Sequence, residues 1–231
     1  MTVFKFALLR ALRSPAALIS NFAAPLAMVL ITPMWTADDG FGSGFFMLAF
    51  LLLFGSFFAA RGIFNDKFDG TVVRILSGPM STLGYLVQNL LACMAVMGTQ
   101  IIVIVIIGAA LYGWGFTLAL ALILCYTMFA ASSVAFSFAW SCLFKSKEVI
   151  VSVFTAVAMV MGALGGLMFP ANLLPRTLYF IGAIFPSHWA SRGLTTLLEY
   201  GMSAGMFWLS MLALTLFIIA FLLYGGKRRI I

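Results

Sequence analysis

Few side chains in this 231-residue sequence could carry chemistry, because it contains one histidine, three cysteines and six acidic residues. Metal and catalytic sites need several such groups clustered together. His188 stands beside Trp189 without a second histidine or an acid cluster, so we interpret it as an interfacial side chain. The cysteines lie inside apolar stretches and are interpreted as small apolar fillers: Cys93, Cys125 and Cys142. The sequence therefore predicts neither a metal site nor a disulfide framework.

Motifs for nucleotide binding or hydrolysis are also missing from the apolar part of the chain. No G-x-x-x-x-G-K-[ST] sequence occurs, and no lysine lies in a glycine-rich phosphate-binding loop. No H-E-x-x-H motif, G-x-S-x-G motif or close pair of acids lies within an apolar block. We therefore predict that the chain is not an enzyme and binds no ATP or other cofactor by itself.

Composition places these few polar groups in a membrane protein. Hydrophobic residues make up 64% of the chain and charged residues 8%, whereas soluble domains have roughly 25% charge. Six apolar blocks are near or above the ~20 residues that cross a bilayer. The blocks are Leu18–Trp35, Phe45–Ala60, Leu86–Tyr112, Phe116–Leu143, Val149–Phe169 and Phe207–Tyr224. We predict an all-α polytopic fold with six transmembrane helices in a single transmembrane domain, residues 1–231.

The basic residues predict how this fold is oriented. Of the 13 Lys and Arg residues, all but Arg176 and Arg192 fall on one side of a six-span arrangement. Because Lys and Arg near span ends are retained in the cytoplasm, both termini are predicted to be inside. The protein would be a multi-pass protein of the cell membrane, the inner or cytoplasmic one. The formal net charge of +7 then reflects orientation and anionic headgroups rather than nucleic-acid binding.

The segment before the first block, residues 3–14, is predicted to be an interfacial amphipathic helix. Its apolar side consists of Phe4, Leu8 and Leu12. Its opposite side carries Lys5, Arg10 and Arg13. Such a helix lies along the inner leaflet, where it either anchors the chain or also has a mechanical role.

Two connections between the blocks have unusual patterns. Residues 61–80 mix charged and apolar side chains and end at Gly78 and Pro79, which predicts a short amphipathic helix below the membrane. This helix either covers the bundle end without a partner or docks onto one. The outer segment 170–205 is apolar but broken by Pro170, Pro175 and Pro186. It is too interrupted for a span, so we predict short re-entrant or interfacial helices there.

Both segments carry motifs that resemble a known family. DKFDGTVVRILSGPMS, residues 66–81, is similar to the loop between the second and third spans of ABC-2-type ABC transporter permeases. GGLMFPANLLPRTLYFIGAIFPSHWA, residues 165–190, is similar to the family's pattern after the fifth span. The resemblance implies a homo- or heterodimer of permease subunits on two copies of an ABC ATP-binding subunit, which would hold ATP and Mg. It implies an ATPase-coupling loop with Asp66, Asp69, Gly70, Thr71 and Arg74. It also implies an outer gate with Gly165, Gly166, Pro170, Pro175 and Pro186.

The interiors of the blocks lack charged residues, and Gln100 is the main strongly polar side chain there. Ion-coupled transporters and channels usually place ionisable groups or exposed carbonyls at mid-membrane. Together with the resemblance, this predicts an ATP-driven exporter of a drug, an antimicrobial peptide or a lipid-like molecule, with a role in multidrug or antibiotic resistance. The alternative is a membrane scaffold or assembly factor without transport, or a small channel. Copurification of a Walker-A ATPase would distinguish them.

Overall fold

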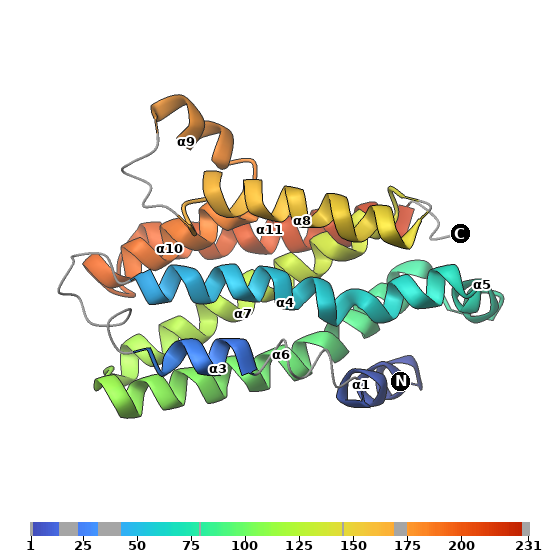
Figure 1. The fold of residues 1–231 in the computed structure, drawn as a ribbon, viewed down its shortest axis with the longest axis horizontal. Coiled ribbons are helices and arrows are strands. Elements are labelled where there is room, and N and C mark those ends of the chain that lie inside the picture. The colour runs from blue at the N-terminus through green and yellow to red at the C-terminus, as the bar shows by residue number, and fades with distance from the viewer. Residues whose placement is uncertain are drawn as a thin grey trace.

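The computed structural model describes residues 2–13, 23–31, 43–78, 80–144, 146–168 and 175–227. Within these ranges every regular element is a helix (Figure 1). The helices are α1 (Thr2–Arg13), α3 (Ala24–Val29), α4 (Ser43–Phe68), α5 (Thr71–Leu76), α6 (Thr82–Tyr112), α7 (Phe116–Ser141), α8 (Lys147–Leu164), α9 (Arg176–Gly182), α10 (Pro186–Tyr200) and α11 (Gly205–Lys227).

Five helices of the described chain are long and apolar enough to cross a membrane. They are α4, α6, α7, α8 and α11, with mean hydropathy between 1.8 and 2.7 over their most apolar windows. They coincide with the second to sixth predicted blocks, so the all-helical, polytopic membrane fold is confirmed. Half of the first block, residues 18–35, lies outside the described residues, and α3 covers only its middle. The sixth span therefore stays a prediction.

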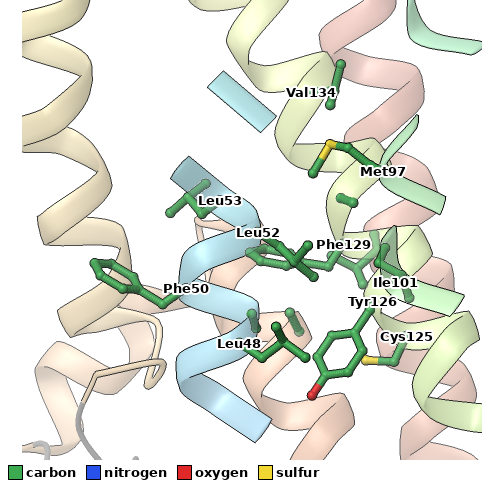
Figure 2. Packing of buried hydrophobic residues seen from close by; sticks show 14 of the residues in the cluster. Leu48, Phe50, Leu52, Leu53, Met97, Ile101, Cys125, Tyr126, Phe129 and Val134 are labelled. Atoms are coloured by element: carbon green, nitrogen blue, oxygen red, sulfur yellow. The ribbon is translucent and has the colours of Figure 1, made fainter. Parts of the chain in front are cut away.

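The core of the bundle is built around α7, which contacts α4, α6, α10 and α11. Figure 2 shows Phe129 and Tyr126 of α7 facing Leu52 of α4 and Ile101 of α6. The Tyr126 hydroxyl donates a hydrogen bond to the carbonyl oxygen of Phe45 at 3.0 Å, so this buried polar atom is satisfied. Close packing of this kind stabilises a bundle in lipid, where the surrounding tails are as apolar as the core.

Small polar residues allow the helices to approach α7 closely. Ser132, Ser137 and Ser141 are fully buried, and their hydroxyls donate to backbone carbonyl oxygens three or four residues earlier, at 2.6 to 2.9 Å. A serine that bonds its own helix backbone presents little polar surface to its neighbours. These residues therefore act as small packing groups rather than as a polar pathway through the bundle.

Helices α1 and α5 lie at the same end of the bundle as the last turns of α11 (Figure 1). We call this the α5 end and the other the opposite end. α1 lies across the direction of the long helices and packs on α6, where the backbone N–H of Phe4 donates to Oε1 of Gln88 at 3.3 Å. α1 and the last turns of α11 thus lie at one end of the bundle, and the side of the membrane that this end faces stays a prediction.

The orientation of α1 about its own axis follows the helical-wheel prediction in part. Lys5 is exposed, and Phe4 and Leu8 are half-buried. Phe6, which the pattern did not place on the apolar side, is 71% exposed, and Ala7 is buried. The Arg10 side chain is 40% exposed and forms an ion pair with Asp66 of α4, a partner that a helical wheel cannot show.

Candidate coupling loop and outer segment

The predicted coupling loop consists of two helices rather than one. α4 continues beyond the second apolar block to Phe68, and α5 begins at Thr71. Gly70 between them has φ of 70°, in the left-handed region that side chains with a Cβ rarely adopt. The sequence pattern did not predict this break, because the apolar spacing continues across it. The helix end expected near Gly78 is confirmed, since α5 stops at Leu76.

Asp66 joins three helices at the α5 end. One of its carboxylate oxygens pairs with the Arg10 guanidinium of α1 at 2.7 Å, and the other accepts a hydrogen bond from the Tyr85 hydroxyl of α6 at 2.7 Å. Gly62, one turn earlier on α4, leaves room for the guanidinium, which a Cβ at that position would strike. Tyr85 is fully buried, so Asp66 is the group that satisfies its hydroxyl. Asp66 thus connects α1, α4 and α6 at the α5 end of the bundle.

Lys67 joins α4 to the end of α7 through hydrogen bonds. Its ammonium group donates to the carbonyl oxygens of Ser141 at 2.7 Å and Phe144 at 3.0 Å. The last carbonyls of a helix have no partner within the helix and carry the negative end of its dipole, so a lysine here is doubly favourable. This contact spans 74 positions in the sequence and ties the predicted coupling loop to the connection between α7 and α8.

Asp69 has a weaker partner. Its carboxylate lies 3.5 Å from the ammonium group of Lys147 at the start of α8, and both side chains are well exposed, by 62% and 44%. The Lys147 ammonium also lies 5.5 Å from the centre of the Phe68 ring. Exposed pairs of this length contribute little to stability, about 0 to 1 kcal/mol. Asp69 is therefore available for another partner at small cost.

The outward face of α5 contains Val73, Arg74 and Ser77, which are exposed. Val73 is 49% exposed, and Arg74 forms no ion pair with any described residue. Thr71 begins the helix and is half-buried, and Val72 is buried beneath it. Of the five residues predicted for coupling, Arg74 and Asp69 thus face outward, Gly70 shapes the turn, and Asp66 is held inside. A docking role for them stays a prediction.

A cavity of about 930 Å³ is lined by residues of α1, α4, α5 and α6. Arg10 and Asp66 line it on one side, and Ile75 and Gln88 on another. Neither this cavity nor the contacts of Arg10, Tyr85 and Lys147 with the loop were predicted. Each contact joins residues distant in the sequence, and no local pattern marks such partners.

At the opposite end, the outer segment folds back onto α8. Ser187 donates to the carbonyl oxygen of Met161 at 2.7 Å, and Ser191 donates to that of Gly166 at 3.1 Å. Gly182 of α9 is pressed against the carbonyl oxygen of Leu164, where a Cβ would not fit. The predicted short helices in this segment are thus α9 and α10, which lie beside the end of α8 in Figure 1.

The predicted outer-gate residues gather partly at this junction. Gly165 caps α8, Gly166 has φ of 78°, Pro175 precedes α9 and Pro186 begins α10. A Cβ on Gly165 would strike the Ser187 hydroxyl. Pro170 lies outside the described residues. Tight glycine contacts hold α8, α9 and α10 together, while movement of this junction as a gate stays a prediction.

Potential metal ligands and the one hydrolase-like motif lie in the described ranges. These ranges contain no group of three His, Cys, Asp or Glu side chains placed to hold a metal ion. Residues 201–205 read G-M-S-A-G, the spacing of a hydrolase nucleophile, but they form the turn between α10 and α11. That motif requires a strand before and a helix after the serine, and Ser203 follows a helix.

Comparison with known proteins agrees with the fold and with both motifs. No curated protein sequence is significantly similar to the chain. The model of the ABC-2 family transporter proteins matches residues 22–226, which cover all five membrane-spanning helices, α5 and the outer segment. Because the match covers most of the chain, this multi-pass membrane protein belongs to the ABC-2 transporter family.

Proposed function

We propose that the chain is the permease subunit of an ATP-driven exporter, and that α5 is the element through which a separate ATP-binding subunit acts on it. The observation that carries the proposal is the construction of the α5 end. α5 presents Val73 and Arg74 outward, while Asp66 and Lys67 behind it are bonded to α1, α6 and α7. A displacement of α5 would therefore move α1, α6 and α7 with it as a rigid body.

The proposed substrate is apolar or amphipathic. The second to sixth apolar blocks contain no Asp, Glu, Lys or Arg in their interiors, and three of the four serines of α7 bond their own backbone. Ser133 Oγ of α7 and Gln100 Oε1 of α6 are the two buried side-chain atoms of the described residues without a hydrogen-bond partner. A hydrophilic substrate would need fixed polar or charged partners within the membrane. Drugs, antimicrobial peptides and lipid-like molecules need few such partners, which favours them and an exporter with a role in drug resistance.

The proposal also includes a second permease subunit. α8 buries one stripe against the bundle, formed by Ile150, Phe154, Ala158, Met161 and Gly162. The rest of its surface is exposed and largely apolar, including Val149, Val151, Met159 and Val160. Such a face is compatible with lipid and with another copy of the permease, and the pair would sit on two ATP-binding subunits.

Reconstitution tests this function. We expect affinity purification of the tagged chain from its native membrane to recover a protein with a Walker-A motif. In proteoliposomes, ATP turnover by the complex should rise with substrate hydrophobicity, because the spans offer mainly apolar contacts. Stimulation by small ions or free sugars, and none by apolar compounds, would contradict the substrate class. Absence of any ATPase from the purified complex would favour a membrane scaffold.

The proposed orientation is tested by cysteine labelling. In a cysteine-free variant, a single cysteine at Ser203 is expected to react with an impermeant maleimide added outside intact cells, while one at Asp69 should react only after permeabilisation. Both side chains are exposed, so access to water does not limit either reaction. Labelling of position 69 in intact cells would reverse the predicted orientation, in which both termini are cytoplasmic.

A further inference from the structure

A second cavity, of about 490 Å³, lies at the opposite end of the bundle. It is open on one side and lined by the end of α8 at Leu164–Gly166, by α9, by one face of α10 and by the start of α11. This volume is in the range of small-molecule sites. Its lining is less uniformly apolar than the bundle core, since His188 and Arg192 of α10 and Tyr179 of α9 face it.

The described residues around this cavity carry charge of one sign. Arg192 is the only permanently charged side chain among those that line it, and none of them is Asp or Glu. The guanidinium lies 5.9 Å from the centre of the Trp189 ring and forms no ion pair with a described residue. Glu199, two turns along α10, is exposed and does not line the cavity. An arginine without an acidic partner in a partly apolar cavity favours an anionic ligand.

The hydroxyls in the cavity are already used as donors. Ser191, Thr195 and Thr196 donate to the carbonyl oxygens of Gly166, Ser191 and Arg192, respectively. The side-chain donors left for a ligand are the Arg192 guanidinium, the imidazole of His188 and the phenols of Tyr179 and Tyr200, none of which has a hydrogen bond within the described residues. This set contains donors and no carboxylate acceptor, as an oxyanion requires.

After Arg192, His188 is the second residue whose surroundings indicate a ligand. It is only 3% exposed, lines the cavity, and packs edge-on against the Tyr179 ring with centroids 4.6 Å apart. Burial and the neighbouring Arg192 charge lower the pKa of His188 below its usual value. The elements facing it contribute no acid: Arg192 and Tyr200 share α10, Tyr179 is on α9, and the lining parts of α8 and α11 carry no titratable group.

We propose that this cavity binds a phosphate group, either free or in a lipid headgroup, through Arg192 and His188. The planar guanidinium suits two oxygens of a phosphate, and the imidazole can donate a further hydrogen bond. The cavity is larger than the anion, so it has room for the glycerol of a headgroup. The site goes beyond the proposed transport function and does not depend on it.

Protonation of His188 would add a second positive charge to the site. A bound anion favours the charged imidazole, so it raises the pKa of His188, and by linkage the anion binds more tightly as the pH falls. At neutral pH, with the pKa of His188 lowered, Arg192 carries the attraction alone. For a phosphodiester such as lysophosphatidylglycerol, whose charge does not change in this range, we expect binding roughly tenfold tighter at about pH 5 than at about pH 8.

NMR of His188 tests the proposal directly, because this is the only histidine in the chain. The full chain, carrying a histidine-free tag and labelled with ¹³C,¹⁵N-histidine, is purified in a maltoside detergent, which contains no phosphate. Lysophosphatidylglycerol, glycerol 3-phosphate and inorganic phosphate are titrated separately, with monoacylglycerol as the phosphate-free probe. We expect the imidazole signals to shift and the pKa of His188 to rise with at least one phosphate probe and not with monoacylglycerol.

Charge-matched variants control the experiment. R192Q is expected to weaken binding at least about tenfold, since a charge-assisted hydrogen bond is lost. R192K should retain part of the affinity for the phosphate probe. R176Q removes the same charge from α9 at a residue that does not line the cavity, and should bind as the unmodified chain. A response to all three phosphate probes supports a free-phosphate site, and a response to lysophosphatidylglycerol alone supports a lipid site. No response to any of them, or an equal response in R192Q, overturns the proposal.

Discussion

Arg74→Glu is expected to abolish copurification of the ATP-binding subunit while the permease remains folded. Arg74 is exposed on α5 and forms no ion pair with any described residue, so the bundle loses no contact when its charge is reversed. If α5 docks into a groove of the partner, a charge of the wrong sign at this interface costs ~2 to 5 kcal/mol. That corresponds to a loss of affinity of roughly 30-fold to several thousand-fold.

Pull-down of the partner and substrate-stimulated ATP turnover measure this effect. Arg61→Glu is the matched control, because Arg61 is an exposed arginine near the same end of the bundle but on α4, against the Phe58 ring. Both variants should change the free energy of unfolding by no more than about 0.5 kcal/mol. Equal loss of the partner in both would indicate a general charge effect, and normal binding of Arg74→Glu would remove α5 from the proposed mechanism.

Gly70→Pro is a less specific test of the same loop. Gly70 has φ of 70°, whereas proline fixes φ near −65°, so the substitution would break the turn between α4 and α5 whether or not α5 docks. Its effect on partner binding could not be separated from a change of local structure. Charge reversal at the exposed side chain of Arg74 separates the effect on partner binding from the effect on local structure.

Sequence patterns predicted the spanning helices because lipid imposes a simple rule on them. Every backbone polar group must be bonded within the helix, so a long apolar run such as residues 116–143 has few alternatives to α7. Pro175 and Pro186 also indicated correctly where the outer segment breaks, and α9 and α10 begin directly after or at them. These features depend on residues close together in the sequence, so the sequence pattern alone was sufficient to predict them.

The roles of individual charged residues were harder to predict. Asp66 and Asp69 are three positions apart in one motif, yet Asp66 is enclosed by Arg10 and Tyr85 while Asp69 faces outward. His188 was interpreted as an interfacial side chain, but it is buried beside a cavity. In each case the difference is set by partners on other helices. The spacing of residues along one segment contains no information about these partners.

Asp66→Ala is expected to be the most destabilising single change at the α5 end. It leaves the Tyr85 hydroxyl, on a fully buried residue, without its acceptor, and it leaves the Arg10 guanidinium without its counter-ion. An unsatisfied buried polar group and an unpaired, partly buried charge together cost about 2 to 4 kcal/mol. For a chain of this size the melting temperature should fall by roughly 5 to 15 °C.

A thiol-reactive fluorophore can follow this unfolding, because Cys93 and Cys125 are buried in the folded bundle and react when it opens. Asp69→Ala is the matched control: the same side chain is lost three residues away, but from an exposed pair worth no more than about 1 kcal/mol.

The double variant Arg10→Ala with Asp66→Ala separates the two contacts of the carboxylate. If Asp66 acts mainly through Arg10, removing both residues should cost about as much as removing Asp66 alone, since contacting residues are not additive. If Tyr85 dominates, Arg10→Ala alone should cost little and Tyr85→Phe should restore most of the stability lost in Asp66→Ala, because no hydroxyl then remains unsatisfied. Equal melting temperatures for Asp66→Ala and Asp69→Ala would show that Asp66 does not brace α1, α4 and α6, and the transmission of movement from α5 would then need another route.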